Sequence, residues 1–350
     1  MVTRITGSTT VSQASVFGSI AYFGEVSASE QSSTSAQTEE ILKKYETLFA
    51  ENGLAKENTI NAFVILSPHA TPGDFFNVWN QWLSDENMPA VTVIRAGLTG
   101  TKFISMALYV ACTSEIERIK LQGGYDGRLV KYNGMVYFSG QSRREGMKTL
   151  TEQTKAVMSS YDEMLSMYNL KKENIINGNI YVQDINMQDE FENVWINWTF
   201  AGHKPAGTMV EGKPLNKDDL LELNLTFADS PSVLDLLRIK PGANCCRFVK
   251  YHNIAYFTGH VCSEPGADDL YKQTKSVFQR FDAVFDEFGL QKENILTAGA
   301  YLKNIGNAPQ FEKAWDEWVN GENPPTRLIC GTRLLSDDFF LELAITVAYE

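Results

Sequence analysis

The six tryptophans of the chain fall into three pairs with the same internal spacing, and this repeat constrains the fold more than any other feature. Each pair has the pattern Trp-x2-Trp and follows a phenylalanine placed four residues before its first tryptophan. The three motifs begin at Phe75, Phe191 and Phe311. The steps of 116 and 120 residues between them are too long for one unit of a solenoid. We therefore interpret each copy as a domain.

Three further landmarks recur at matching offsets. A Gln-Thr pair begins a helical segment, a Lys-Glu-Asn triplet follows that helix, and a proline-containing pair follows the tryptophans. These landmarks begin at Gln37, Lys56 and Pro89, then at Gln153, Lys172 and Pro205, and then at Gln273, Lys292 and Pro325. We expect domains at 1–112, 113–230 and 231–350. Because the joins are short, the repeat predicts that one chain packs as an intramolecular pseudo-trimer.

Hydrophobic periodicity predicts the elements of each copy. After each Gln-Thr pair, apolar residues recur at i, i+1, i+4, i+7 and i+8, which is one face of an amphipathic helix. The Phe-x3-Trp-x2-Trp segment is a second helix facing a core. Apolar runs such as 20–23, 62–66 and 103–110 are typical of strands. The order β-β-α-β-α-β-β predicts an α+β fold, a mixed β-sheet with two helices on one face.

Composition narrows the function classes. The formal net charge is −12 with both signs scattered, so we expect no nucleic-acid partner. No run of eighteen apolar residues occurs, so we expect no membrane span. The four histidines and five cysteines show no metal-ligand spacing and no disulfide framework, so we expect no metal. With no secretory signal at the N-terminus, these features favour a cytoplasmic protein.

The second copy carries an ordered set of motifs that the other copies repeat with changes. Its members are NGMVYFSGQ at 133–141, Gln153-Thr154, NIYV at 179–182, the aromatic helix and Pro205-Ala206. Over nearly the whole chain, three times, this set resembles the RidA/YjgF family (endoribonuclease L-PSP-like). The resemblance implies chorismate-mutase-like domains, ligand clefts between neighbouring domains and no cofactor. The best-known activity of the family is hydrolysis of enamine and imine intermediates such as 2-aminoacrylate, which implies a small carboxylate-bearing metabolite as partner.

The same resemblance implies roles for two positions. In active members an arginine after the Pro-Ala pair holds the substrate carboxylate with its planar guanidinium. A glutamate fifteen residues later helps to position the attacking water. Arg327 and Glu342 match both positions in the third copy. The matching residues are Gly207 and Glu222 in the second copy and Val91 and Met106 in the first. The resemblance thus implies one cleft, with Arg327 as substrate anchor and Glu342 as catalytic residue.

Supporting positions differ between the copies. The segment that contains Ser139 and Gly140 in the second copy corresponds to Thr258, Gly259 and His260 in the third, and to Phe23-Gly24-Glu25 in the first. The resemblance implies substrate binding by Ser139, Gly140, Thr258, Gly259 and His260. A family tyrosine is replaced by Thr10, Asp126 and Cys245. For His260 the alternative is a packed or solvated histidine, and for the adjacent Cys245 and Cys246 it is a pair of free thiols rather than a strained disulfide.

Two functions remain open from the sequence. The first is deamination of enamines and imines at the Arg327 cleft, in the manner of a 2-iminobutanoate/2-iminopropanoate deaminase. The second is a non-catalytic carboxylate-metabolite binder or scaffold with degenerate sites, in which Arg327 pairs with a nearby acid and Glu342 belongs to a structural ion pair. An endoribonuclease, a third possibility, suits the acidic charge poorly.

Overall fold

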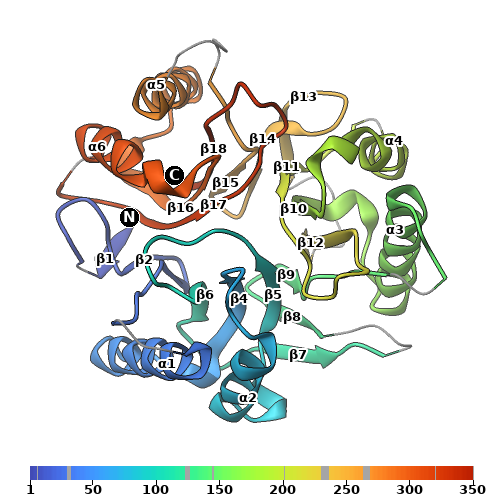
Figure 1. Cartoon of the computed structure of the whole chain (residues 1–350), viewed down its shortest axis with the longest axis horizontal. Coiled ribbons are helices and arrows are strands. Elements are labelled where there is room, and N and C mark those ends of the chain that lie inside the picture. The colour runs from blue at the N-terminus through green and yellow to red at the C-terminus, as the bar shows by residue number, and fades with distance from the viewer. Residues whose placement is uncertain are drawn as a thin grey trace.

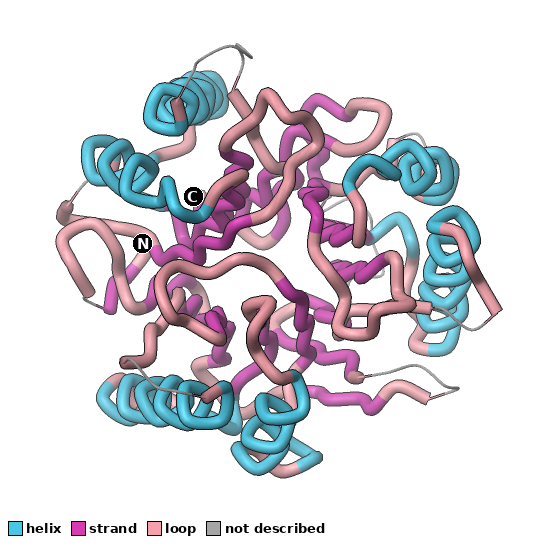
Figure 2. Tube along the Cα trace, viewed as in Figure 1, coloured by secondary structure: helices cyan, strands magenta, loops and turns pink. Residues whose placement is uncertain are grey.

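Three six-stranded sheets surround a common axis, and each carries two α-helices on its outer face (Figures 1 and 2). This computed structural model describes residues 1–5, 7–29, 33–122, 127–143, 146–200, 202–229, 236–262, 269–319 and 321–349. The α+β class, the tandem repeat and the pseudo-trimer predicted from the sequence are confirmed. The domain boundaries stay a prediction, and "first", "second" and "third domain" below mean the parts that build the three sheets.

The elements of the three domains follow the same order. In the first they are β1 (Thr3–Ile5), β2 (Ala14–Phe17), β3 (Ile20–Phe23), α1 (Thr34–Glu51), β4 (Thr59–Leu66), α2 (Pro72–Trp82), β5 (Ala90–Arg95) and β6 (Ile104–Ala111). In the second they are β7 (Glu117–Lys120), β8 (Arg128–Tyr132), β9 (Met135–Phe138), α3 (Leu150–Met167), β10 (Ile175–Val182), α4 (Gln188–Trp198), β11 (Ala206–Glu211) and β12 (Leu221–Ala228). In the third they are β13 (Leu237–Pro241), β14 (Cys246–Tyr251), β15 (Ile254–Phe257), α5 (Leu270–Phe288), β16 (Ile295–Leu302), α6 (Ala308–Trp318), β17 (Thr326–Gly331) and β18 (Leu341–Ala348).

Each sheet contains one more strand than the periodicity predicts. The first sheet has the order β1-β2-β3-β6-β4-β5, and the other two repeat it. The neighbours β4 and β5 run parallel, as do their counterparts in the other sheets, while the remaining pairs are antiparallel. The unpredicted strands are the edge strands β1, β7 and β13. They are three to five residues long and mix charged with apolar side chains, so they give no clear strand signal.

In every domain, the glutamine of the Gln-Thr pair joins the first helix to the start of the last strand by a hydrogen bond. Its side-chain oxygen accepts a hydrogen bond from a backbone N–H just before that strand. The pairs are Gln37 with Phe103 (2.7 Å), Gln153 with Leu220 (2.8 Å) and Gln273 with Phe340 (2.7 Å). All three glutamines are buried, so these bonds satisfy groups that water does not reach.

The two tryptophans of each motif have different partners. The indole of the second donates to an acid on the first helix: Trp82 to Glu46, Trp198 to Asp162, and Trp318 to Asp282, at 2.9–3.1 Å. In the second and third domains the first tryptophan reaches a neighbouring domain, because Trp195 donates to the carbonyl of Asn244 and Trp315 to that of Thr10, each at 2.8 Å. The repeated motif therefore joins helices within a domain and also joins neighbouring domains.

Three equivalent arginines fix the cyclic order of the domains. Each lies on the edge strand and donates to the glutamate carbonyl of a neighbour's Lys-Glu-Asn triplet. The bonds run from Arg4 to Glu293 (2.6 Å), from Arg118 to Glu57 (2.6 Å) and from Arg238 to Glu173 (2.5 Å). Burial lowers the pKa of Arg4 to about 10. The recurrence of the triplet thus has a structural cause, since its backbone receives the neighbour's arginine.

A backbone hydrogen bond recurs at the same place in all three interfaces. The second residue after β3, β9 or β15 donates its N–H to a carbonyl near the start of a neighbour's outer strand. The bonds are Gly140 to Val91 (3.1 Å), Gly259 to Gly207 (3.1 Å) and Glu25 to Arg327 (3.0 Å). Glu25, rather than Gly24, is therefore the counterpart of Gly140 and Gly259, which corrects the expected alignment of the first copy by one residue.

The expected alignment of β6, the last strand of the first domain, is also wrong by one residue. Glu222 lies opposite Tyr181 and Glu342 lies opposite Tyr301, whereas the residue at this place in the first domain is Ser105, opposite Ile65. Met106, which the sequence placed here, belongs to the core beneath the helices. A shift of one residue in a strand moves a side chain to the other face, so the error changes the character of the position.

One steric relation explains why the first domain differs from the others at both positions. A Cβ added at Gly140 would lie 2.0 Å from Oε1 of Glu222, and one added at Gly259 would lie 2.0 Å from Oε1 of Glu342. A side chain at this position would therefore push the strand glutamate out of its place. In the first domain both residues change together, because Glu25 replaces the glycine and Ser105 replaces the glutamate.

This exchange generates a double-mutant prediction. Ser105→Glu alone should destabilise the chain, because the new carboxyl group meets Glu25 in a buried place. Adding Glu25→Gly should recover part of the loss, with a coupling energy of about 1–3 kcal/mol. Thermal unfolding of the wild type, the two single variants and the double variant measures this coupling. A double variant as unstable as the sum of the two single changes would contradict the exchange.

Candidate functional site

Each interface combines residues of two neighbouring domains. One domain supplies the position that Arg327 occupies in the third copy, and the next supplies the position that Glu342 occupies there. The interdomain hydrogen bonds described above determine this pairing. Val91 of the first domain therefore faces the part of the second that holds Glu222, and Gly207 of the second faces the part of the third that holds Glu342. Arg327 faces the first domain, where a Cβ at Gly24 would lie 3.0 Å from the Arg327 backbone N.

The structure does not bring Arg327 and Glu342 into one cleft, which corrects the expectation from the sequence. The two residues lie on β17 and β18, which β16 separates. Arg327 packs on the helix side of its sheet. Glu342 alternates with Leu341 and Leu343, which belong to the core beneath the helices, so its side chain points to the opposite face. The fifteen-residue spacing is the one that the resemblance implies, but the two residues belong to different interfaces. Their individual roles stay predictions.

Arg327 is held by its own domain. Its Nη2 forms an ion pair with Glu312 of α6, and its guanidinium carbon lies 5.2 Å from the ring centre of Trp315 and 5.8 Å from that of Phe311. The side chain is 13% exposed, and its Nη1 has no hydrogen-bond partner. Burial lowers the pKa of Arg327. This geometry matches the alternative reading of an arginine paired with a nearby acid.

The charges on the first-domain side of this interface are also paired. Lys102 Nζ lies 2.6 Å from Oε1 of Glu25, and both side chains are mostly buried. Burial raises the pKa of Glu312, against the opposing effect of Arg327. Two cations and two carboxylates therefore neutralise one another here, and a carboxylate ligand would have to displace Glu312 from Arg327.

Glu342 lines a pocket between the second and third domains. The cavity of about 130 Å³ is bounded by Ile180, Phe191, Glu192, Trp195, Gly207, Met209, Asn244, Cys245, Thr258, Gly259, Leu335 and Glu342. Glu342 is 4% exposed, its Oε2 has no hydrogen-bond partner, and burial raises its pKa to about 8. None of these described lining residues is a lysine or an arginine, so nothing at the pocket wall offsets the burial of the carboxyl group.

The polar groups around Glu342 come mainly from the third domain. The Thr258 hydroxyl accepts a hydrogen bond from the Gly207 N–H (3.1 Å) and donates to the carbonyl of Cys246. It therefore links the second domain to the third beside the pocket. Cys245 and Cys246 are free thiols, as one of the two alternatives expected. Burial raises the pKa of Cys245. Of the residues at the family's tyrosine position, Cys245 lines the pocket, and Asp126 lies outside the described residues.

His260 does not face this pocket, contrary to the expected binding role. Its ring stacks on Phe281 of α5 at 4.5 Å between centres, and its Nδ1 lies 2.8 Å from the carbonyl of Thr258. Burial lowers the pKa of His260 to about 4, so the imidazole is neutral at physiological pH. The strand places this side chain beneath the helix, where it belongs to the core.

Ser139 and Gly140 lie in the interface between the first and second domains, away from Glu342. The Ser139 hydroxyl accepts hydrogen bonds from the N–H groups of Val91 (3.1 Å) and Arg128 (2.9 Å). Gly140 lies against Glu222 and near Thr92. The predicted binding residues are therefore divided among three interfaces, so they do not form one site.

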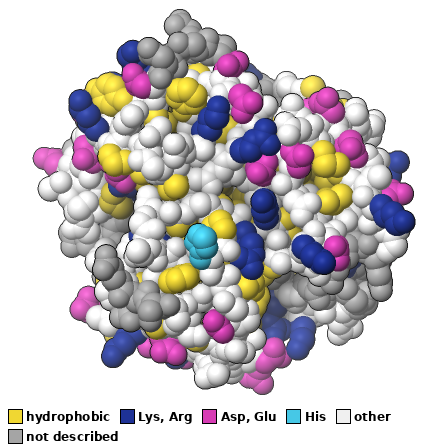
Figure 3. All heavy atoms as spheres, viewed as in Figure 1, with side chains coloured by type: hydrophobic (Ala, Val, Ile, Leu, Met, Phe, Trp, Pro, Cys, Tyr) yellow, Lys and Arg dark blue, Asp and Glu magenta, His cyan; other side chains and the backbone are white. Residues whose placement is uncertain are grey.

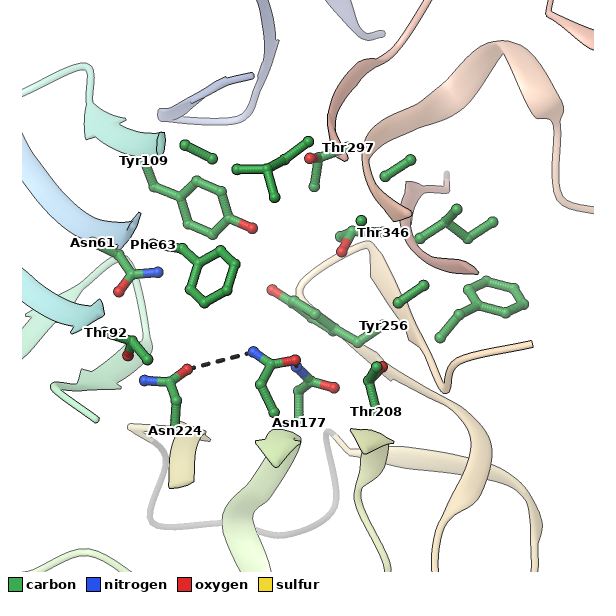
Figure 4. Close-up of a pocket in the computed structure, with 18 of the residues that line it drawn as sticks. Asn61, Phe63, Thr92, Tyr109, Asn177, Thr208, Asn224, Tyr256, Thr297 and Thr346 are labelled. Carbon is green, nitrogen blue, oxygen red and sulfur yellow. Dashed lines mark hydrogen bonds between the residues drawn. The ribbon is translucent and has the colours of Figure 1, made fainter. Parts of the chain in front are cut away.

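A second cavity, which the sequence did not indicate, lies between the inner faces of the three sheets (Figure 4). Its volume is about 130 Å³, and its polar lining carries no charged side chain; the residues include Asn61, Thr92, Tyr109, Asn177, Thr208, Asn224, Tyr256, Thr297 and Thr346. Asn179 donates to Asn224 at 3.5 Å. The Thr92 hydroxyl is buried without a partner. Such a chamber suits ordered water.

The described residues contain neither a cluster of metal-binding side chains nor a helix suited to cross a membrane. No group of three or more His, Cys, Asp or Glu side chains there is arranged to hold a metal ion. Among the helices of the described ranges, none combines the length and the apolar character that a membrane crossing requires.

Comparison with known proteins identifies the family. The model of the family named Endoribonuclease L-PSP matches residues 115–228 and 237–349, together more than half of the chain. A RutC family protein of Haemophilus influenzae is 33% identical over 112 residues, covering 32% of this chain and 97% of the relative. The RutC family protein YoaB of Escherichia coli K12 is 29% identical over 115 residues, covering 33% of this chain and 99% of the relative.

A solved structure shares the fold over most of the chain. A chorismatase aligns over 83% of this chain and 93% of its own length with a TM-score of 0.62 and 10% identity. A YjgF-family member of Neisseria meningitidis covers 33% of this chain and 96% of its own, with a TM-score of 0.32 and 23% identity. The family match, the repeated fold and the repeated order of motifs lead to one conclusion: the chain belongs to the Endoribonuclease L-PSP (RidA/YjgF) family, as tandem domains.

Proposed function

We propose that this protein binds a small amine or related nitrogen base in the Glu342 pocket, and that it is not an imine hydrolase built on an arginine–glutamate pair. The observation that carries the proposal is the state of Glu342. A buried carboxyl group with no partner for one oxygen and no lysine or arginine among the described lining residues is an unsatisfied acceptor. A ligand that supplies N–H donors or a positive charge would satisfy it.

The other walls suit the same ligand. Trp195 and Phe191 present aromatic rings to the pocket, and Glu192 of the same helix adds a second carboxyl group. Ammonium groups bind well to carboxylates and to aromatic faces. Ile180, Met209 and Leu335 offer apolar contact to the rest of a small ligand. The cavity volume limits the ligand to a few heavy atoms.

A carboxylate ligand, expected from the resemblance, fits this pocket poorly because it would meet Glu342 and Glu192 with no cation among the described lining residues. The cation that could hold it, Arg327, is already paired with Glu312 in another interface. Deamination of enamines and imines anchored by Arg327 would therefore require both the release of Glu312 and a water-positioning group that Ser105 does not supply.

The raised pKa of Glu342 predicts a pH-dependent stability penalty. In the unfolded chain a glutamate titrates near its ordinary pKa of 4.5, whereas Glu342 in the folded chain keeps its proton up to about pH 8. Between these values the unfolded state binds fewer protons, so rising pH lowers the contribution of this group by about 1.4 kcal/mol per pH unit. Glu342→Gln should remove the penalty and raise Tm over the wild type, by more at pH 8 than at pH 5. The exposed Glu115→Gln is the matched control, and an equal Tm difference at both pH values would contradict the shift.

Ligand binding tests the function directly, with butylamine as probe and butyrate as its carboxylate counterpart. Titration calorimetry on the full chain should show saturable binding of butylamine, and Glu342→Gln should abolish it. Below pH 8 the ammonium must displace the Glu342 proton, so affinity should rise about tenfold per pH unit from pH 6 and level off above 8.

The same samples test the competing activity. Generated in situ, 2-iminobutanoate should disappear at the buffer rate in the presence of the wild type. Hydrolysis above that rate that is lost in Arg327→Ala, or butyrate binding that is lost in the same variant, would overturn the proposal in favour of the activity implied by the resemblance.

A further inference from the structure

A basin on the pseudo-threefold axis gathers cations from all three domains, although the chain as a whole carries a formal net charge of −12. Figure 3 shows Lys and Arg side chains around the middle of this face. The basin has a volume of about 610 Å³, and its charged lining residues are Arg95, Lys213, Lys303, Arg333 and Glu211. A concave surface with an excess of one sign of charge concentrates ligands of the opposite sign.

The basin has a rigid backbone base. The last residues of β5, β11 and β17 and the residues just after them are joined in a closed triangle of hydrogen bonds. Arg95 and Lys213 form an antiparallel bridge (2.8 and 3.2 Å), Gly97 and Gly331 form another (2.8 Å in each direction), and the Glu211 N–H donates to the Arg333 carbonyl (3.0 Å). Each domain therefore supplies one side of the base, and the basin exists only in the assembled three-domain chain.

Two of the four cations have carboxylate partners. Arg333 lies 3.4 Å from Glu211 and 3.6 Å from Asp184, and Lys303 lies 3.7 Å from Asp337. These contacts neutralise much of their charge at the rim. The local excess of positive charge therefore rests on the remaining pair, Arg95 and Lys213.

Arg95 and Lys213 have no carboxylate partner within the described part of the chain. They stand directly opposite each other in their bridge, where side chains share a face and like charges repel. Nη1 of Arg95 is oriented by the carbonyls of Ser67, Pro68 and Ala70 at 3.1–3.4 Å. A dianion placed between the two would remove the repulsion and gain hydrogen bonds from both.

We propose that this basin binds a small phosphorylated molecule, with its phosphate group between Arg95 and Lys213. A phosphate group carries close to two negative charges at neutral pH, which matches the two unpaired cations. The volume beyond the phosphate accommodates a metabolite of ordinary size. The site is separate from the Glu342 pocket, and the two proposals stand independently.

Titration calorimetry of the full chain with inorganic pyrophosphate at low ionic strength tests this site. Saturable binding should weaken roughly tenfold in Lys213→Gln and in Arg95→Gln, and rising salt should weaken it in the wild type. Lys43→Gln, which removes the same charge from an exposed position of α1, should leave the affinity unchanged. Glu342→Gln should also leave it unchanged.

Three results would overturn the proposal: no saturable binding of pyrophosphate, an equal loss in Lys43→Gln, or citrate binding as tightly as pyrophosphate. The first removes the site, the second assigns the effect to net charge, and the third removes the preference for phosphate. Thermal unfolding of each variant without ligand separates a lost site from a lost fold.

Discussion

The backbone hydrogen bond that joins each domain to its neighbour determines what every interface can do. It runs from the second residue after β3, β9 or β15 to the start of the neighbour's outer strand, at 3.0–3.1 Å in all three places. Because of this bond, the arginine position of one domain faces the glutamate position of the next. A chain that retains Arg327 and Glu342 in the same domain therefore retains them in two different interfaces, where they cannot act on one ligand.

The fold could be predicted from the sequence because its signals are long-range repeats. The tryptophan pairs and the Gln-Thr and Lys-Glu-Asn landmarks all have structural roles, and they recur because the same contact is made three times. The edge strands could not be predicted, because β1, β7 and β13 are short and partly polar. Their main contribution is an arginine that reaches another domain, and local periodicity cannot show such a contact.

The site was predicted less well, for two physical reasons. First, the combination of residues in a cleft depends on which domain faces which, and the sequence of one copy does not contain that information. Second, counting fifteen residues from Val91 leads to Met106, whereas strand pairing places Ser105 opposite Ile65. The first copy lacks the strand glutamate, and this loss could have raised the suspicion that the neighbouring glycine position had changed as well, to Glu25. The pocket itself depends on Gly207, because a residue without a side chain leaves this space open. At the equivalent position of the third domain, the Arg327 side chain fills the corresponding space.

The pKa of Glu342 tests the division of residues among interfaces most directly, and carboxyl NMR of the full chain measures it. In Gly207→Arg the new cation enters the Glu342 pocket, and a Cβ added at Gly207 would meet no atom closer than 3.6 Å. We expect a Glu342 pKa well below 8 in Gly207→Arg and an unchanged value in Arg327→Ala. A Glu342 pKa that rises in Arg327→Ala and does not respond to Gly207→Arg would show that Arg327 and Glu342 share one cleft after all.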